Sequence, residues 1–155
     1  IDAAEFNNPT SDSDFGMQDV SKHYHLGSFH QSQECFEVIF NKTLYENLAE
    51  EQRSILEYAA EAASSDMAWK AMERYSNSLV DLKTKHGVNV HRTPDSVMKD
   101  QLVAWDKVVA RISNEDPFFK KVIDSQMAWA KRHGAYSLNN APDYRGAYEH
   151  YFGKL

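Results

Sequence analysis

The sequence is poor in features that mark several common protein classes. Its 155 residues include one cysteine, Cys35, which excludes a disulfide within the chain. No apolar run approaches the roughly eighteen residues that a membrane-spanning helix needs. The 17 basic residues are outnumbered by 23 acidic ones and are scattered along the chain. This argues against a nucleic-acid partner, because binding phosphates requires a clustered basic surface.

Signatures of common enzymes are absent as well. The chain has no glycine-rich phosphate loop, no Gly-x-Ser-x-Gly nucleophile elbow and no His-Glu-x-x-His motif. Cys35 with His30 would offer a nucleophile and a base, but Cys35 begins a predicted strand and no third group to orient the histidine is evident. The sequence therefore predicts a protein that is not an enzyme.

Helical periodicity dominates the later part of the chain. Apolar residues recur at spacings of three and four from Glu50 to His86, and Gly87 is a natural C-terminal cap. At 1.5 Å per residue this helix would span about 55 Å, so we allow a bend at Ser64–Ser65. A short helical turn, Thr43–Leu48, precedes it.

Two further helices follow, each opened by a capping residue and a proline. The first starts at Thr93-Pro94, and its apolar stripe consists of Met98, Leu102, Trp105, Val109 and Ile112. The second starts at Asp116-Pro117 and is predicted to end before Gly134. The aromatic-rich tail after Gly134 shows no clear period.

Strand signals are concentrated near the front of the chain. Residues 35–41 alternate apolar and polar side chains and are rich in aromatic and β-branched types, which predicts a strand. The weaker strand candidates are Ile1–Phe6, His23–Leu26 and Val88–His91, and a brief helix is predicted from Ser11 to Val20. A lone long strand cannot satisfy its own backbone, so we expect its partners in an absent N-terminal half.

Together these residues resemble the C-terminal half of a DctP-type substrate-binding protein of tripartite ATP-independent periplasmic (TRAP) transporters, in the mannitol/chloroaromatic or 2-oxo-acid branch. The resemblance covers roughly Ile1 to His133. The matching pieces, in chain order, are Ile1–Phe6, Pro9, Phe15-Gly16, Val20–Tyr24, Phe29–Gln31, Glu37–Lys42 and Leu48–Arg53.

The resemblance implies an α/β fold, part of a two-lobed periplasmic binding protein that is helix-rich with a few strands. Residues 35–42 would form a hinge-crossing strand between the lobes. Residues 1–134 would be the C-terminal portion of the solute-binding fold, and residues 135–155 a C-terminal tail. The implied role is to capture a small organic acid, of the 2-oxo or 2-hydroxy type, in the periplasm and to deliver it to the TRAP membrane permease. Some relatives dimerise through C-terminal helices, so a homodimer through the C-terminal helix and tail is also expected.

The resemblance also implies a binding site in the cleft between the lobes. Glu5 would supply a carboxylate oxygen, Phe6 a backbone carbonyl and Gln31 an amide oxygen to a cation that bridges to the ligand's carboxylate. An all-oxygen set suits a hard ion such as Na⁺ or Ca²⁺. Phe29 would line the pocket. The chain departs from its relatives in having Phe6 where Trp is common and Gln31 where Glu is frequent, which weakens the case for a divalent ion.

Three alternatives remain open at this point. Glu5 and Gln31 are also compatible with an ordinary surface acid and loop amide. His23, His25 and His30 could hold zinc if a further ligand completed the set. The chain could instead be a helical interaction module that uses the stripe from Met98 to Ile112 and binds no small ligand, although such a module would not need the polar loop at residues 30–34.

Overall fold

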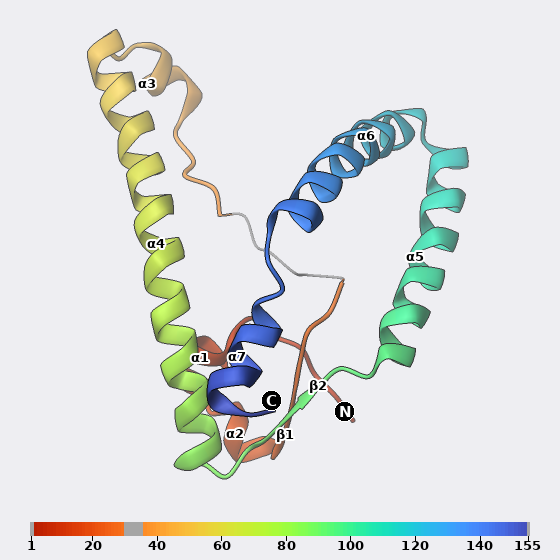
Figure 1. Cartoon of the computed structure of the whole chain (residues 1–155). Helices are drawn as coiled ribbons and strands as arrows, with labels where there is room; N and C mark the ends of the chain where they lie inside the picture. Colours follow the sequence, from red (N-terminus) through yellow and green to blue (C-terminus); the bar gives the residue numbers. More distant parts are fainter. Residues whose placement is uncertain (1, 30–35, 155) are drawn as a thin grey trace. The chain divides into compact units, whose positions relative to one another are not determined.

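The computed structural model describes residues 2–29 and 36–154 (Figure 1). It is rich in helix and carries a small sheet, which confirms the α/β, helix-rich class. The elements in chain order are α1 (Pro9–Asp14), α2 (Met17–Val20), β1 (His23–Leu26), α3 (Lys42–Glu46), α4 (Glu50–Thr84), β2 (Asn89–Arg92), α5 (Asp95–Glu115), α6 (Pro117–Asn140) and α7 (Tyr144–Phe152).

The chain divides into two units, Ile1–Met98 and Lys99–Leu155. The first unit contains the sheet, helices α1 to α4 and the first turn of α5. The second contains the rest of α5 together with α6 and α7. The boundary falls inside α5, so the chain passes from one unit to the other along a helix.

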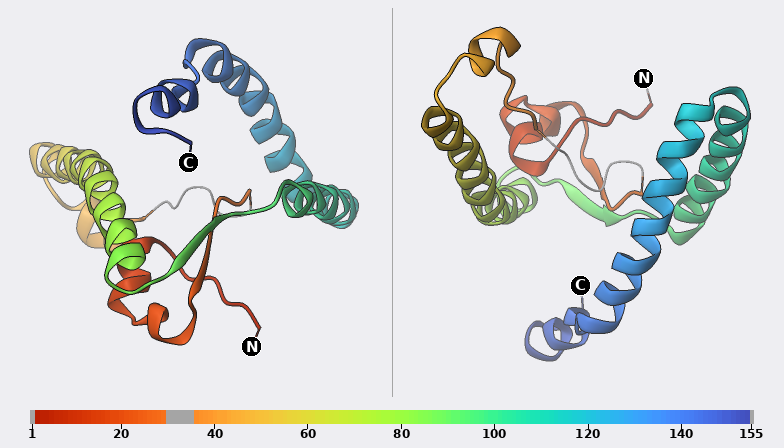
Figure 2. Two further views of the ribbon diagram at one scale, coloured as in Figure 1. Left: turned by 60° about the horizontal axis from the view of Figure 1, so that its bottom comes forward. Right: turned by 90° about the horizontal axis from the view of Figure 1, so that it is seen from above.

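Strands β1 and β2 form the small sheet seen in the ribbon views of Figure 2. They pair in parallel, with His23 opposite Asn89 and Leu26 opposite Arg92. Parallel neighbours require a long connection, and here α4 lies within it. The strand prediction at His23–Leu26 is confirmed, and the one at Val88–His91 is confirmed with a shift of one residue.

The segment before β1 folds into two short helices. Helix α1 starts at Pro9 because the Asn8 side chain caps it, accepting hydrogen bonds from the backbone N–H groups of Thr10 and Ser11. Gly16, with φ of +75°, separates α1 from α2. The helix predicted from Ser11 therefore starts earlier and is interrupted. The strand expected at the front is wrong over its described residues 2–6, which belong to no strand.

Helix α1 packs on the C-terminal part of α4. Thr10 Oγ1 and Ser78 Oγ lie 2.9 Å apart across this contact. Leu82 near the end of α4 and Val88 just before β2 are the buried apolar residues of the described chain. The small core therefore sits where α4 turns into β2.

Helix α4 starts at Glu50 as the periodicity predicted and runs unbroken for 35 residues to Thr84, two residues short of the predicted end at His86. The helix continues through Ser64–Ser65, and the Ser64 hydroxyl donates a hydrogen bond to the Ala60 carbonyl. Gly87 has φ of +64°, a conformation that favours glycine, and the Val88 N–H donates to the Leu82 carbonyl at 2.9 Å. These contacts close the helix where a cap was predicted.

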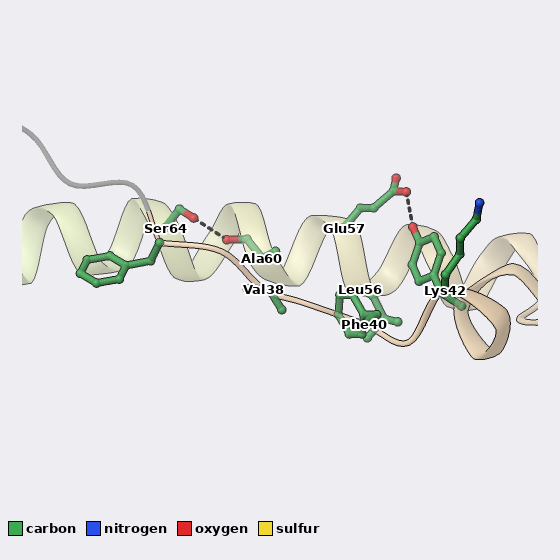
Figure 3. A pocket seen from close by; sticks show the side chains of 9 residues that line it. Val38, Phe40, Lys42, Leu56, Glu57, Ala60 and Ser64 are labelled. Carbon is green, nitrogen blue, oxygen red and sulfur yellow. Dashed lines mark hydrogen bonds between the residues drawn. The ribbon is translucent and has the colours of Figure 1, made fainter.

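The strand predicted at residues 35–41 is wrong over its described part, Phe36–Asn41, which belongs to no strand. Instead the segment runs beside α4, and Val38 and Phe40 lie close to Leu56 and Ala60 (Figure 3). Alternating side chains favour a strand, but a strand also needs a hydrogen-bonded neighbour, and β1 and β2 pair with each other. The described residues of this segment therefore form no hinge-crossing strand.

Helix α6 starts where it was predicted and ends later. Asp116 caps α6 by accepting hydrogen bonds from the N–H groups of Phe118 and Phe119. The prediction that this helix ends before Gly134 is wrong, because it continues to Asn140. A glycine inside a helix costs only about 1 kcal/mol relative to alanine, so one glycine need not end it. Part of the tail, for which no period was found, forms α7 with Asp143 as its cap.

Candidate functional site

The carboxyl ends of β1 and β2 lie side by side, and a small hollow is found there. In α/β sheets, ligands bind in the crevice outside the carboxyl ends of parallel strands. The hollow has a volume of about 180 Å³. Its lining residues are Leu26, Gly27, Phe29, Arg92, Thr93, Asp95 and Met98. All belong to the first unit, and Phe29 was predicted from the resemblance as a pocket residue.

Thr93, the first residue after β2, links the ends of the two strands beside this hollow. Thr93 donates two hydrogen bonds to the Leu26 carbonyl, from its backbone N–H at 3.0 Å and from its hydroxyl at 3.2 Å. Gly27, with φ of +89°, then turns the chain away from the sheet towards Phe29. Because both bonds converge on one carbonyl, the two chain segments that leave the sheet are held together.

The hollow combines apolar and charged groups. Phe29, which is 54% exposed, and Met98 contribute apolar surface. Arg92 and Asp95 contribute one charge of each sign, and they form no ion pair with each other. Helix α5 begins at Asp95, so the positive end of its dipole also faces this region. The arrangement can hold a small ligand that has an apolar part and an anionic group.

The other predicted site residues lie outside the lining of this hollow. Glu5 and Phe6 are exposed in the segment before α1, where the Phe6 ring packs edge-on against Phe15 with ring centres 4.9 Å apart. Gln31 lies outside the described residues, as do His30 and Cys35. The described structure therefore shows where Glu5, Phe6 and Phe29 lie but brings no predicted cation-binding set together.

The segment that carries Glu5 and Phe6 is anchored to β1 through a buried carboxylate. Asp12 accepts a hydrogen bond from the Asn7 N–H at 3.2 Å through Oδ1, and one from the Tyr24 hydroxyl at 2.6 Å through Oδ2. Burial of Tyr24, its hydrogen bond to Asp12 and the nearby negative charge of Asp12 raise the pKa of the Tyr24 hydroxyl well above its usual range. The phenol therefore stays protonated and keeps donating to the carboxylate.

Three histidines cluster on one face of the sheet. His23 Nδ1 lies 3.0 Å from His91 Nε2, and the ring of His91 also stacks on that of His25 with centres 4.9 Å apart. Among residues 2–29 and 36–154, no group of three or more His, Cys, Asp or Glu side chains could hold a metal ion. The zinc alternative had grouped His23 and His25 with His30. His91 joins them instead, which only the strand register could have revealed.

A larger hollow of about 500 Å³ lies between the segment from Phe36 to Tyr45 and helix α4 (Figure 3). Apolar side chains such as Val38, Phe40 and Leu56 form much of its lining. At one end the Tyr45 hydroxyl donates a 2.5 Å hydrogen bond to Glu57 Oε1, which raises the pKa of Tyr45. No residue predicted to bind a ligand lines this hollow.

None of the helices in the described part of the chain is long and apolar enough to cross a membrane.

Comparison with known protein families identifies the chain's relatives. The family described as bacterial extracellular solute-binding protein, family 7 (DctP), matches residues 1–116. The match includes the hollow at the strand ends, the anchored segment with Glu5 and Phe6, and all of α5. The search of solved structures found no match.

Proposed function

The chain belongs to family 7 of the bacterial extracellular solute-binding proteins, and on this premise we propose that it captures a small organic acid of the 2-oxo or 2-hydroxy type and delivers it to a TRAP membrane permease. Proteins of this family bind solutes outside the cytoplasm and are not enzymes. Membership implies a small-molecule ligand and a permease as partners. The nature of the acid, the use of a cation and the delivery step are the proposal.

The observation that carries this proposal is the hollow at the carboxyl ends of β1 and β2. It lies inside the family match and contains Phe29, the aromatic residue expected in the pocket. Its volume, about 180 Å³, is below the 300–1,000 Å³ that is usual for complete ligand pockets. The apolar surface of Phe29 would exclude water from one side of a bound ligand.

We further propose that a cation assists binding. Glu5, the Phe6 carbonyl and Gln31 form an all-oxygen donor set, and such donors fit Na⁺ or Ca²⁺ better than a soft metal. One carboxylate in the set favours an ion of low charge. The cation would let a protein with net charge −6 hold an anion without direct repulsion between like charges.

In this mechanism the chain positions the donors from two directions. Asp12 ties the segment after Phe6 to β1, and the carboxyl end of β1 leads through Gly27 and Phe29 to Gln31. If the ion and the acid bind together, each must raise the affinity of the other by the same factor.

The test is calorimetric titration of pyruvate and lactate into the full chain, with and without Na⁺ or Ca²⁺. Wild-type affinity should depend on one of these ions. Glu5→Ala should weaken binding more than Gln31→Ala, because it removes a charge from the coordination shell, and both should reduce the dependence on the ion. Glu61→Ala, at an exposed acid in α4, is the matched control and should bind as the wild type does. Binding that ignores every cation and is unchanged by Glu5→Ala would refute the cation site.

A homodimer through the C-terminal helix and tail is part of the same proposal, with residues 1–134 as the solute-binding portion and 135–155 as the tail. Several aromatic residues of α7 support it, because Tyr144, Tyr151 and Phe152 are each more than 70% exposed. Large exposed aromatic groups often mark a contact surface. The alternative of a helical interaction module receives similar support from the exposed Leu102 and Trp105 in α5, but it leaves the family match and the hollow without a role.

A further inference from the structure

His23 and His91 bring two imidazole nitrogens together across the sheet. His23 is the first residue of β1, His91 belongs to β2, and the distance from His23 Nδ1 to His91 Nε2 is 3.0 Å. Their rings are stacked, with centres 5.3 Å apart and 24° between the planes. The His23 side chain is exposed and that of His91 is half-buried, so ions in solution can reach the pair. The proposed solute site does not use these nitrogens.

The sheet holds the two side chains near each other before any ligand arrives. Parallel pairing places His25 opposite His91 and His23 opposite Asn89, so the three histidines share one face. The ring of His25 also stacks on that of His91, with centres 4.9 Å apart and 27° between the planes. Strand register and ring stacking together limit how far the His91 imidazole can move away from His23.

The spacing of the two nitrogens suits one coordination geometry better than another. A bond from a metal ion to an imidazole nitrogen is about 2.0–2.1 Å long. Two such bonds at a right angle put the nitrogens about 2.9 Å apart, whereas the tetrahedral angle of zinc sites puts them about 3.4 Å apart. The observed 3.0 Å is closer to the right angle. Right angles are typical of the square-planar and tetragonal sites of Cu²⁺ and Ni²⁺, and Cu²⁺ is the more tightly bound of the two.

Both nitrogens can offer a lone pair to the same ion. In the metal-free pair one nitrogen donates a hydrogen bond to the other, and the tautomers decide which one is the donor. If the donating ring carries its proton on its other nitrogen instead, both imidazoles remain neutral and no proton is gained or lost. A small rotation of the two rings then directs both lone pairs towards one point.

We propose that His23 Nδ1 and His91 Nε2 chelate one Cu²⁺ ion at a site separate from the proposed solute site. Among residues 2–29 and 36–154 no third His, Cys, Asp or Glu completes the set, so water fills the remaining positions. The two ligands are 68 positions apart in the chain and meet only when β1 pairs with β2. The ion therefore binds the folded sheet more tightly than the unfolded chain and stabilises the fold.

The experiment titrates Cu²⁺ into the full chain carrying Cys35→Ser, which removes the thiol as a competing metal ligand. Calorimetry gives the dissociation constant, and electron paramagnetic resonance counts the coordinated nitrogens. One Cu²⁺ with two imidazole nitrogens is expected. His23→Gln and His91→Gln should each weaken binding about tenfold or more, because one of the two protein ligands is lost. His86→Gln, at an exposed histidine just after α4, is the matched control and should leave binding unchanged. Circular dichroism checks that each variant keeps its fold.

Two further measurements separate this site from general binding of Cu²⁺ to histidines. His25→Phe keeps a ring beside His91 but removes the nitrogens of His25, so the nitrogen count should stay at two. A count of one would make His25 a ligand and refute the proposed pair. Saturating Cu²⁺ should raise the urea midpoint of the Cys35→Ser chain but not that of its His23→Gln variant, and an equal rise in both would contradict a link between the strands.

Two results of the titration itself would also refute the site. One is an equal affinity for Cu²⁺ with and without His23→Gln or His91→Gln. The other is a loss in His86→Gln as large as theirs, because binding would then be spread over many histidines. Each of these outcomes is independent of the solute that the chain binds.

Discussion

Tyr24 donates a 2.6 Å hydrogen bond to Oδ2 of Asp12, and this carboxylate is 6% exposed. The other oxygen of Asp12 accepts from the Asn7 N–H. One buried carboxylate therefore joins the N-terminal segment, α1 and β1. Since the segment before Asn7 carries Glu5 and Phe6, this link positions half of the proposed cation site.

We expect Asp12→Ala to lower the free energy of unfolding by about 1–3 kcal/mol, because it leaves the Tyr24 hydroxyl and the Asn7 N–H without their acceptor. Urea denaturation followed by circular dichroism measures this. Asp14→Ala, at an exposed acid of the same helix, is the control and should change the stability by no more than about 0.5 kcal/mol. Equal effects of the two substitutions would contradict the anchoring role.

Stability should also depend on pH in the alkaline range through Tyr24. The pKa of its hydroxyl is raised in the folded state, so its contribution is complete below about pH 10, the unfolded pKa, and is lost as the pH rises from there towards the folded pKa. Tyr24→Phe should remove this part of the pH dependence. The measurement is the urea midpoint from pH 8 to pH 11, with Tyr58→Phe at an exposed tyrosine as the control. Parallel pH profiles for Tyr24→Phe and the wild type would contradict it.

Two glycine substitutions should act in opposite directions. Gly87→Ala should destabilise the chain by about 1–2 kcal/mol, because φ is +64° there and an added Cβ meets no other atom that could compensate. Gly134→Ala should stabilise α6 by about 0.5–1 kcal/mol, because this glycine lies within a helix and has open space around it. Thermal and urea unfolding of both variants test the signs. A stabilising Gly87→Ala would show that the end of α4 is not fixed by this turn.

If the protein is a homodimer through its tail, removal of residues 141–155 should change its mass in solution from that of two chains to that of one. This cut leaves α6 whole, because α6 ends at Asn140. Light scattering coupled to size-exclusion chromatography measures the mass, and Tyr151→Ser with Phe152→Ser tests the same surface without shortening the chain. If the mass in solution still corresponds to two chains after either change, the dimer contact lies elsewhere.

The helices could be predicted because their signals are local. The spacing of apolar residues identified α4, and the capping residues Asp116 and Gly87 fixed two helix ends. A single glycine is a weaker signal. Gly134 alone predicts a stop, but the cost of one glycine within a long helix is too small to end α6 without further support.

The sheet could be predicted only in part, because alternation locates a strand but does not identify its partner. His23–Leu26 was found as a strand, whereas its pairing with Asn89–Arg92 depends on packing of distant segments. For Phe36–Asn41 the strand prediction is wrong. This segment has alternating side chains typical of a strand, but no strand lies beside it among the described residues.

The candidate site could likewise be predicted only in part. Phe29 was predicted from the resemblance and lines the hollow at the strand ends. Arg92 was not singled out, because an arginine gains significance only when the register places it beside Leu26 and the turn at Gly27. The proposed donors Glu5 and Gln31 stay predictions.

The parallel pairing of β1 with β2 also affects how quickly the chain can fold. His23 and His91, which touch across the strands, are 68 positions apart, so a long loop must close before they meet. Helices form within about a microsecond, while pairing between distant segments is much slower. We therefore expect α4 to form first and to shorten the search, with strand closure setting the refolding rate. In stopped-flow experiments Val90→Ala should then slow refolding, whereas Ala substitutions on the exposed face of α5 should leave that rate unchanged.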